Sequence, residues 1–305
     1  MKKAIVTGAT SMLGIATVKT LIDMNYKVLA VSRKGSTRRN QVPDSEMITF
    51  VESDLSELSN IALDCNDYDV FFHFGWAYTD RSTRNVPELQ VKNVQYTLDA
   101  INLAHKAGCK RFLFAGSQAE YGKVDGIINA ETPVNPKVAY GICKYSAEKL
   151  GQLLCDELGI VFIGCRIFSV YGINDSENTM ISYAFKQYYN KEVAQFSSGE
   201  QMWNYLNEKD AGKVFVLLGE KCETSGIKLV AHSKGKPLRD YINDISHVLG
   251  EDFRYNLAEK GNDNTISLNV DVGNLYNDIG FYPEVSFSDG IESILSSGRF
   301  SVVDQ

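Results

Sequence analysis

The stretch that decides the fold is Lys3-Ala-Ile-Val-Thr7, which runs directly into Gly8-Ala-Thr-Ser-Met-Leu-Gly14. The first part is a short run of strand-forming residues, and the second is a turn that contains two glycines. From residue 15 to residue 24, apolar residues recur at helical spacing. The order strand, glycine-containing turn and helix is the setting in which a loop can cradle a phosphate group. An ordinary βα turn with incidental glycines is the alternative.

The rest of the first half repeats this alternation. Strands are predicted over residues 27–32, 47–52, 69–74, 111–115 and 160–165, with helices over 87–107 and 137–157 among the segments between them. Alternating strands and helices are typical of a doubly wound parallel sheet, which binds ligands beyond the carboxyl ends of its strands.

Periodicity weakens after residue 172. Helices are predicted over 180–190, 209–218 and 237–249, and strands over 193–196 and 227–231, while 269–294 is the last recognisable segment. We therefore expect a dinucleotide-binding domain over 1–172, with its sheet completed by parts of 193–231. Residues 173–305 are expected to form mainly a small α/β substrate-binding lobe.

Composition excludes several classes of protein. The 305 residues carry a net charge of −7 and no basic stripe, which argues against nucleic-acid binding. No apolar run reaches the roughly 18–20 residues that span a bilayer, so we expect no membrane association. Six cysteines are scattered without a CxxC pair. This pattern argues against a metal site and against disulfides, and it favours a reducing, cytoplasmic location.

The end of the second predicted strand indicates which dinucleotide is bound. An acidic residue there would bond the ribose 2′-hydroxyl of NAD, but the sequence is Ser32-Arg33-Lys34. Arg33 can pair with a 2′-phosphate, so NADP is favoured over NAD. The alternative is that Arg33 and Lys34 belong to a solvated loop.

Tyr140 and Lys144 lie four positions apart in the helix predicted over 137–157, so they share one helix face. A free tyrosine has a pKa of about 10, and a nearby cation lowers that pKa into a range useful for acid–base catalysis. Taken alone, such a pair is more often found on a solvated helix. The argument therefore depends on the segments around it.

Several segments together resemble the extended short-chain dehydrogenase/reductases, the nucleotide-sugar epimerase, dehydratase and reductase group. They are TGATSMLG from Thr7, HFGW from His73, GSQAEYG from Gly116, YGICK from Tyr140 and RIFSVYG from Arg166. They occur in the family's order over nearly the whole chain. The resemblance implies a Rossmann-type doubly wound sheet with a small C-terminal α/β lobe.

The resemblance also implies a role for each matched residue. Ser117 would bond the substrate oxygen, Tyr140 would be the acid–base group on that oxygen, and Lys144 would hold the nicotinamide ribose. Asn93 and His73 are interpreted as structural. The implied cofactor-binding residues are Gly8, Thr10, Ser11, Met12, Leu13, Gly14, Arg33, Asp54, Leu55, Phe74, Gly75, Trp76 and Lys144.

Three further residues are candidates for substrate binding. Asn178 matches a position that often contacts the substrate diphosphate. Glu120 resembles the AEYG loop of reductases of 4-keto-6-deoxy sugar nucleotides, with a surface carboxylate as the alternative. Phe196 is a candidate for stacking on the base, with core packing as the alternative.

Two departures from the family pattern limit which reactions and substrates are expected. Gln118 and Ala119 replace the Asp-Glu pair of the dehydratases, which argues against dehydration. Trp203-Asn204 stands where the family has Arg-Asp, so the arginine that usually binds the substrate diphosphate is missing here. Lys209 or Lys213 could substitute, or the substrate could be of another class.

Three functions follow from this interpretation. The first is an NADP-linked or NAD-linked reductase of a 4-keto-6-deoxy sugar nucleotide. The second is a nucleotide-sugar 4-epimerase with tightly bound NAD, and the third is a non-catalytic dinucleotide-binding protein. The expected partners are a nucleotide-sugar substrate and a second copy of the chain in a homodimer.

Overall fold

Seven parallel strands form the central sheet of the computed structural model, which describes residues 1–259 and 266–301. Their order is β11-β6-β5-β4-β1-β2-β3. The strand order reverses between β1 and β4, which places a crevice at their carboxyl ends. These observations confirm the predicted Rossmann-type doubly wound sheet. The strands are β1 (Lys3–Thr7), β2 (Lys27–Ser32), β3 (Ile48–Glu52), β4 (Val70–His73), β5 (Arg111–Ser117), β6 (Val161–Ile167) and β11 (Gly226–Val230).

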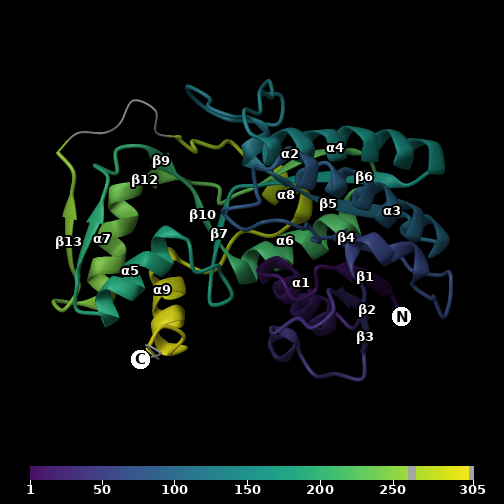
Figure 1. Ribbon diagram of the computed structural model, residues 1–305, viewed down its shortest axis with the longest axis horizontal. Coiled ribbons are helices and arrows are strands. Elements are labelled where there is room, and N and C mark those ends of the chain that lie inside the picture. Colours follow the sequence, from purple (N-terminus) through teal and green to yellow (C-terminus); the bar gives the residue numbers. More distant parts are fainter. Residues whose placement is uncertain (260–265, 302–305) are drawn as a thin grey trace.

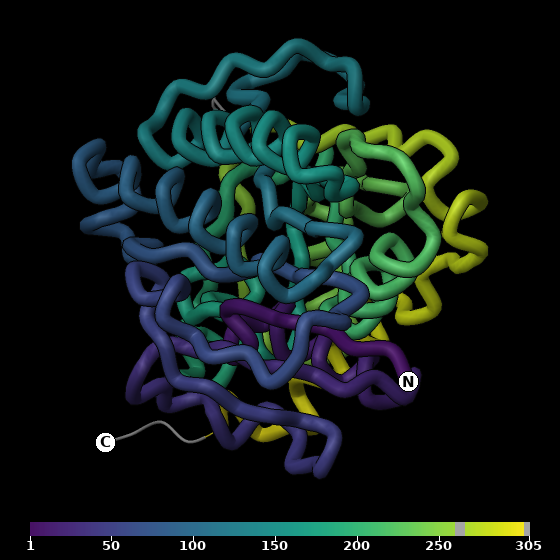
Figure 2. Tube along the Cα trace, turned by 90° about the vertical axis from the view of Figure 1, so that its right-hand side faces the viewer, coloured from purple at the N-terminus to yellow at the C-terminus, as the bar shows by residue number. Residues whose placement is uncertain are grey.

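Helices cover both faces of this sheet (Figure 1). Helices α1 (Met12–Asp23), α6 (Glu208–Lys221) and α8 (Leu275–Ile279) pack on one face, while α3 (Lys92–Lys106) and α4 (Ala139–Leu158) pack on the other. Figure 2 shows α3 and α4, in blue to teal, above the purple N-terminal strands. Successive residues of β1 serve the two faces: Ala4 and Val6 join the α1/α6 core, and Ile5 joins the α3/α4 core. This alternation follows from the two-residue period of a strand.

The helix predicted over 87–107 is divided into α2 (Pro87–Gln90) and α3 at Val91. The side-chain amide of Asn93 donates to the Gln90 carbonyl at 3.4 Å, and the Val94 N–H donates to the Val91 carbonyl at 3.1 Å. The regular i to i−4 ladder is therefore interrupted at this turn. The same amide also donates to the Ala77 carbonyl at 3.1 Å, so the interruption ties the helix to the loop after β4.

The C-terminal part has its own apolar core, which includes Tyr171, Phe185, Ile245 and Ile291. A Cβ atom on Gly290 would lie 2.1 Å from the Tyr171 hydroxyl, so glycine is required for this close approach. The elements around this core are α5 (Met180–Tyr189), α7 (Leu238–Leu249), α9 (Phe287–Ser296), β8 (Val193–Phe196) and β13 (Arg254–Leu257).

Short strand pairs link the two parts of the chain. Strand β7 (Ser169–Tyr171) pairs with β10 (Tyr205–Asn207), and β9 (Met202–Trp203) pairs with β12 (Lys236–Pro237). Within segment 193–231, β11 joins the large sheet, whereas β8 pairs with β13 in the lobe. Residues 260–265 and 302–305 of the predicted lobe lie outside the described residues. In the described part of the chain, no helix is both long and apolar enough to cross a membrane.

Candidate active site

A cavity of about 650 Å³ lies at the carboxyl ends of β1, β2 and β4, where the strand order predicts a ligand. Its wall combines glycine backbone, small hydroxyl side chains and one exposed arginine, a set suited to a dinucleotide. The predicted cofactor residues that line it are Gly8, Thr10, Ser11, Arg33, Asp54, Leu55, Phe74, Gly75 and Trp76.

The glycine turn is built for close backbone approach. Gly8 has a φ of +67°, and a Cβ atom on it would lie 2.8 Å from the Gly75 nitrogen. A Cβ atom on Gly14 would lie 2.2 Å from the Gly8 carbonyl oxygen. The Ser11 hydroxyl accepts from the Gly14 N–H at 3.0 Å and caps α1. The other predicted cofactor residues, Met12, Leu13, Gly14 and Lys144, are not part of the cavity wall, and the first three form the first turn of α1.

This turn fits a pyrophosphate. The first N–H groups of a helix have no partner within it, and the helix dipole favours an anion there. Because α1 begins at the cavity wall and Gly8 leaves room beside Gly75, the residues present fit the dinucleotide that the sequence implies.

The end of β2 faces the same cavity. Arg33 is exposed and lines it, whereas Lys34 points to Glu57 and makes an ion pair of 2.7 Å. Ser36 and Arg38 also line the cavity, although the sequence did not single them out. The Arg38 guanidinium donates to the Asn174 carbonyl at 2.7 Å, so it is already engaged with the segment that leads to α5.

Tyr140 and Lys144 both contact Trp76, which is part of the cavity wall. The Trp76 ring lines the cavity and lies edge-on to Tyr140, with 6.0 Å between ring centroids. The Lys144 ammonium lies 3.7 Å from the centroid of the Trp76 ring and donates to the Ala115 carbonyl at 2.6 Å. Lys144 is only 4% exposed, and burial lowers its pKa, with the Glu120 carboxylate opposing that effect.

Ser117, the last residue of β5, is close enough to the Tyr140 hydroxyl for its side chain to lower the pKa of Tyr140. Burial raises the pKa of Tyr140, while the charge of Arg84 and the Ser117 side chain lower it. The three residues that the sequence placed in the catalytic group do not line the cavity themselves, but Tyr140 and Lys144 both contact Trp76, which does. Arg84, which the sequence did not single out, lies over the Tyr140 ring at 3.9 Å.

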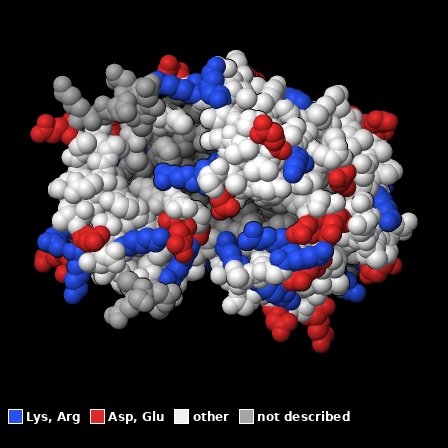
Figure 3. Space-filling model, viewed as in Figure 1, with Lys and Arg blue, Asp and Glu red and all other residues white. Residues whose placement is uncertain are grey.

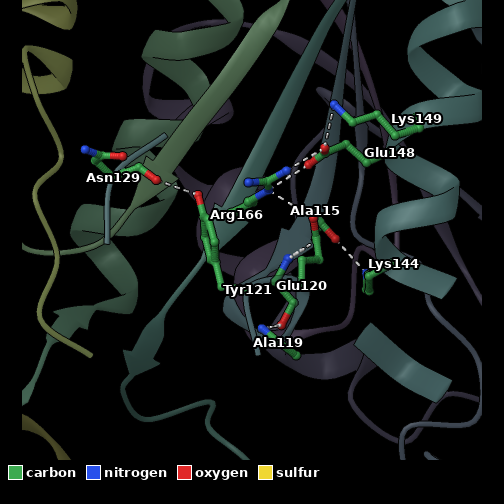
Figure 4. Close-up of polar contacts among 10 residues, drawn as sticks. Ala115, Ala119, Glu120, Tyr121, Asn129, Lys144, Glu148, Lys149 and Arg166 are labelled. Carbon is green, nitrogen blue, oxygen red and sulfur yellow. Dashed lines mark hydrogen bonds and ion pairs between the residues drawn. The ribbon is translucent and has the colours of Figure 1, made fainter. Parts of the chain in front are cut away.

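Glu120 lies beneath this group rather than on the surface. It is fully buried, accepts from the Ser117 N–H at 2.6 Å, and pairs with Arg166 at 3.0 Å. Arg166 also holds Glu148 with two hydrogen bonds, of 2.8 and 3.0 Å (Figure 4). Burial raises the pKa of Glu120, as does the neighbouring Glu148 carboxylate, whereas Arg166 lowers it. The carboxylate therefore supports the Ser117 turn, and its burial disfavours a direct contact with substrate.

Two buried amides hold Trp76 and the residues after it. Gln90 accepts from the Trp76 indole N–H at 2.9 Å and donates to the Tyr78 carbonyl at 2.8 Å. Asn93 accepts from the Ala77 N–H at 2.7 Å, in line with its predicted structural role. The sequence motifs did not point to Gln90, although the pattern of polar residues along the helix could have done so. Gln90, Asn93 and Thr97 form a polar stripe on the buried face of an otherwise amphipathic helix.

The remaining substrate candidates lie in the C-terminal part, away from the cavity wall. Asn178 is exposed just before Thr179, which caps α5. Phe196 packs edge-on against Tyr183, with 5.6 Å between ring centroids. The surface is recessed between this part and the sheet-bearing part (Figure 3).

Asn204, the second residue of the Trp203-Asn204 pair that replaces the family's Arg-Asp, has a structural role. The buried Asn204 amide donates to the His232 carbonyl at 2.8 Å and accepts from its N–H at 2.7 Å. Of the two suggested substitutes for the arginine, Lys213 points to Glu284 at 3.5 Å, and Lys209 is exposed at the start of α6.

The sequence profile of the NAD dependent epimerase/dehydratase family matches residues 4–230. The chain belongs to this family. The resemblance drawn from the sequence motifs is confirmed, as is the prediction that the protein is an enzyme.

Curated relatives of this family member include proteins that cover most of its length. A putative UDP-glucose 4-epimerase of Methanocaldococcus jannaschii is 25% identical over 307 residues, 96% of this chain and 97% of that protein. A dTDP-6-deoxy-L-talose 4-dehydrogenase (NAD(+)) of Aggregatibacter actinomycetemcomitans is 25% identical over 254 residues, 79% of this chain and 88% of that protein.

Among solved structures, the UDP-N-acetylglucosamine 4-epimerase from Methanobrevibacter ruminantium, in complex with UDP-N-acetylmuramic acid, superposes with a TM-score of 0.84. It is 23% identical, and the match covers 97% of this chain and 99% of that one. At this identity the likeness shows that the family member has the same fold.

Proposed function

We propose that this protein moves a hydride at a sugar carbon of a nucleotide sugar, and that it reduces a 4-keto-6-deoxy sugar nucleotide. The observation that carries the proposal is that Tyr140 and Lys144 both contact Trp76, a residue of the cavity wall, and that Ser117 lies near Tyr140. Ser117 and Tyr140 would share the substrate oxygen, and Tyr140 would give that oxygen its proton. Lys144 would hold the ribose of the nicotinamide.

When bound, the nicotinamide supplies the hydride. The end of β2 supports NADP as the preferred cofactor, because Arg33 lines the cavity next to the buried Ser32, where NAD-selective sites carry an acid. A 2′-phosphate would give Arg33 a charge-assisted partner. A reductase consumes its reduced cofactor and exchanges it for a new one in every turnover, and NADPH would serve in this way.

Gln118 and Ala119 support reduction rather than dehydration. They follow Ser117 directly, and neither is an acid or a base that could remove water from the sugar. The talose 4-dehydrogenase relative acts on a 6-deoxy sugar nucleotide by its name, which also supports the proposed substrate class.

A nucleotide-sugar 4-epimerase with tightly bound NAD is the second candidate. It is favoured by the names of the full-length relatives, and it would use the same Ser117, Tyr140 and Lys144. The two candidates differ in what happens to the cofactor. The reductase consumes NADPH, whereas the epimerase retains NAD and shows no net redox change.

We also place the nucleotide part of the substrate in the recess beside the C-terminal lobe, near Asn178 and Phe196. The protein would act as a homodimer in the cytoplasm. The six free cysteines, four of them buried, support a reducing compartment.

The test mixes purified protein with a 4-keto-6-deoxy sugar nucleotide and either NADPH or NADH, and follows absorbance at the nicotinamide band. We expect NADPH to be consumed, and Tyr140→Phe to abolish turnover while leaving cofactor affinity nearly unchanged. Loss of the phenol removes the proton donor but no cofactor contact that the cavity shows. Retained NAD with no NADPH consumption would contradict the reductase and favour the epimerase. Wild-type activity in Tyr140→Phe would remove Tyr140 from the mechanism.

A further inference from the structure

Arg84 lies closer to the Tyr140 ring than Lys144 does. Its guanidinium carbon is 3.9 Å from the ring centroid, whereas the Lys144 ammonium is 5.9 Å away. We propose that Arg84 is a positioning residue for the acid–base step: it holds the Tyr140 ring and stabilises its phenolate form, beside or in place of Lys144.

The position of Lys144 supports the assignment of this role to Arg84. Its ammonium donates to the Ala115 carbonyl and lies over Trp76, so its hydrogen bond goes to the backbone of β5 and not to Tyr140. A lysine in this arrangement is suited to holding a ribose, but it leaves Tyr140 short of a cation. Arg84 supplies one.

The loop that carries Arg84 is built to place it there. The backbone N–H groups of Thr83 and Arg84 both donate to the Asp80 carbonyl, at 3.0 and 2.8 Å. At the start of the loop, Tyr78 has a φ of +61°, and the Gln90 amide holds its carbonyl. A non-glycine residue in this region costs free energy, which indicates that the surrounding contacts impose the loop conformation.

The Arg84 guanidinium is available to act on Tyr140. It is exposed, and within residues 1–259 and 266–301 no hydrogen bond or ion pair engages its guanidinium. Among the described residues, its guanidinium therefore stacks on Tyr140, and a guanidinium over an aromatic face is a favourable arrangement.

Four groups that bear charge or a hydroxyl act on Tyr140. Arg84 comes from the loop before α2, Ser117 from the end of β5, Glu120 from η3 (Gln118–Glu120) and Lys144 from the same helix, α4. Burial and the Glu120 carboxylate raise the pKa of Tyr140, whereas the charge of Arg84 and the Ser117 side chain lower it. Removing Arg84 therefore takes away a cation from a site that already disfavours the phenolate.

The test is a spectrophotometric pH titration of tyrosinate absorbance in the cofactor-free protein, with the Tyr140→Phe protein subtracted to isolate Tyr140 from the other fifteen tyrosines. We expect Arg84→Gln to move the Tyr140 ionisation upward by about one pH unit, which is a tenfold change in the ionisation constant. Arg84→Lys should recover part of the shift, because the charge remains but the planar stacking is lost.

Arg81→Gln is the matched control. Arg81 is exposed in the same loop, and the change removes the same charge without touching Tyr140. It should leave the titration unchanged. An unchanged titration in Arg84→Gln, or an equal shift in Arg81→Gln, would overturn the proposal.

Activity gives a second readout. The inference rests on the proposed acid–base role of Tyr140, but the titration needs no substrate, so its failure is distinct from failure of the reductase assay. If turnover is observed, the pH at which kcat/KM for alcohol oxidation falls on the acid side should also rise by about one unit in Arg84→Gln. A uniform loss of rate with an unmoved pH profile would indicate a structural role only and would contradict the proposal.

Discussion

His73 shows how burial near the site couples to stability. It lies at the carboxyl end of β4, it is 1% exposed, and its Nδ1 is 2.8 Å from the Thr7 hydroxyl. Burial lowers the pKa of His73 to about 3, and the Lys144 charge adds to the effect. The folded protein therefore keeps this ring neutral in the acid range where an unfolded chain protonates it.

This difference predicts a loss of stability in acid. Below about pH 6.5 the His73 ring binds a proton in the unfolded state but not in the folded state. The free energy of unfolding therefore falls as the pH drops toward the folded pKa of about 3. Between about pH 6.5 and about pH 4.5, His73 should account for about 2–3 kcal/mol of that loss. His73→Asn, followed by urea unfolding across this range, should show a correspondingly shallower pH dependence.

The exposed His105 on α3 provides the control for His73. His105→Asn should leave the pH dependence as in the wild type. A His73→Asn protein with the wild-type pH dependence would show that the ring is not the group that senses acid.

Single residues were predictable where spacing alone decides position. Tyr140 and Lys144 share a helix face because they are four apart, and Gly8 and Gly14 flank the turn that starts α1. The direction of the Lys144 ammonium was not predictable, because it depends on Trp76 from a distant strand end. Glu120 was interpreted from its loop, but its buried partner Arg166 comes from β6, which no local pattern indicates.

At the scale of elements, the contact between the glycine turn and α1 leaves no room for a side chain. A Cβ atom on Gly14 would lie 2.2 Å from the Gly8 carbonyl oxygen and 2.8 Å from the Cα atom of Ala9. Gly14→Ala should therefore displace α1 from the turn and lower the free energy of unfolding by about 1–3 kcal/mol, despite the higher helix propensity of alanine. Dinucleotide affinity should fall as well, measured by fluorescence titration with NADPH.

Gly226→Ala in β11 is the control for this change, since a Cβ atom there meets no atom within 4 Å. It should leave dinucleotide affinity unchanged and alter stability by no more than about 1 kcal/mol. Equal effects of the two substitutions would contradict the steric argument.

Long elements were predicted better than short ones. All seven strands of the central sheet and the helices with clear periodicity follow from the hydrophobic pattern, because each spans several residues of one environment. Pairs such as β7 with β10 and β9 with β12 have only two or three residues per strand, too few for a period. The division of the helix at Val91 likewise depends on a tertiary contact, the bond from Asn93 to the Ala77 carbonyl.

At the scale of the whole molecule, α4 has two functional faces. One is buried and carries Lys144 toward the sheet. The opposite face exposes Ile142, Leu150 and Leu153, which are 47%, 46% and 66% exposed. At helical spacing these three side chains form one apolar stripe. Such a stripe on a helix is costly in water and is suited to burial against an equivalent helix of a second copy.

We therefore predict that the wild-type protein is a dimer through α4 and that Leu153→Glu dissociates it, as measured by sedimentation velocity. In a two-fold interface each substitution occurs twice, so two unpaired carboxylates would be buried in it. Ile127→Glu is the matched control, because Ile127 is 61% exposed but lies outside α4, and it should remain dimeric. A monomeric wild type, or a Leu153→Glu protein that sediments as a dimer, would rule out this interface. Because the stripe lies on the side of α4 opposite Lys144, the monomeric variant should retain NADPH affinity even when the dimer is lost.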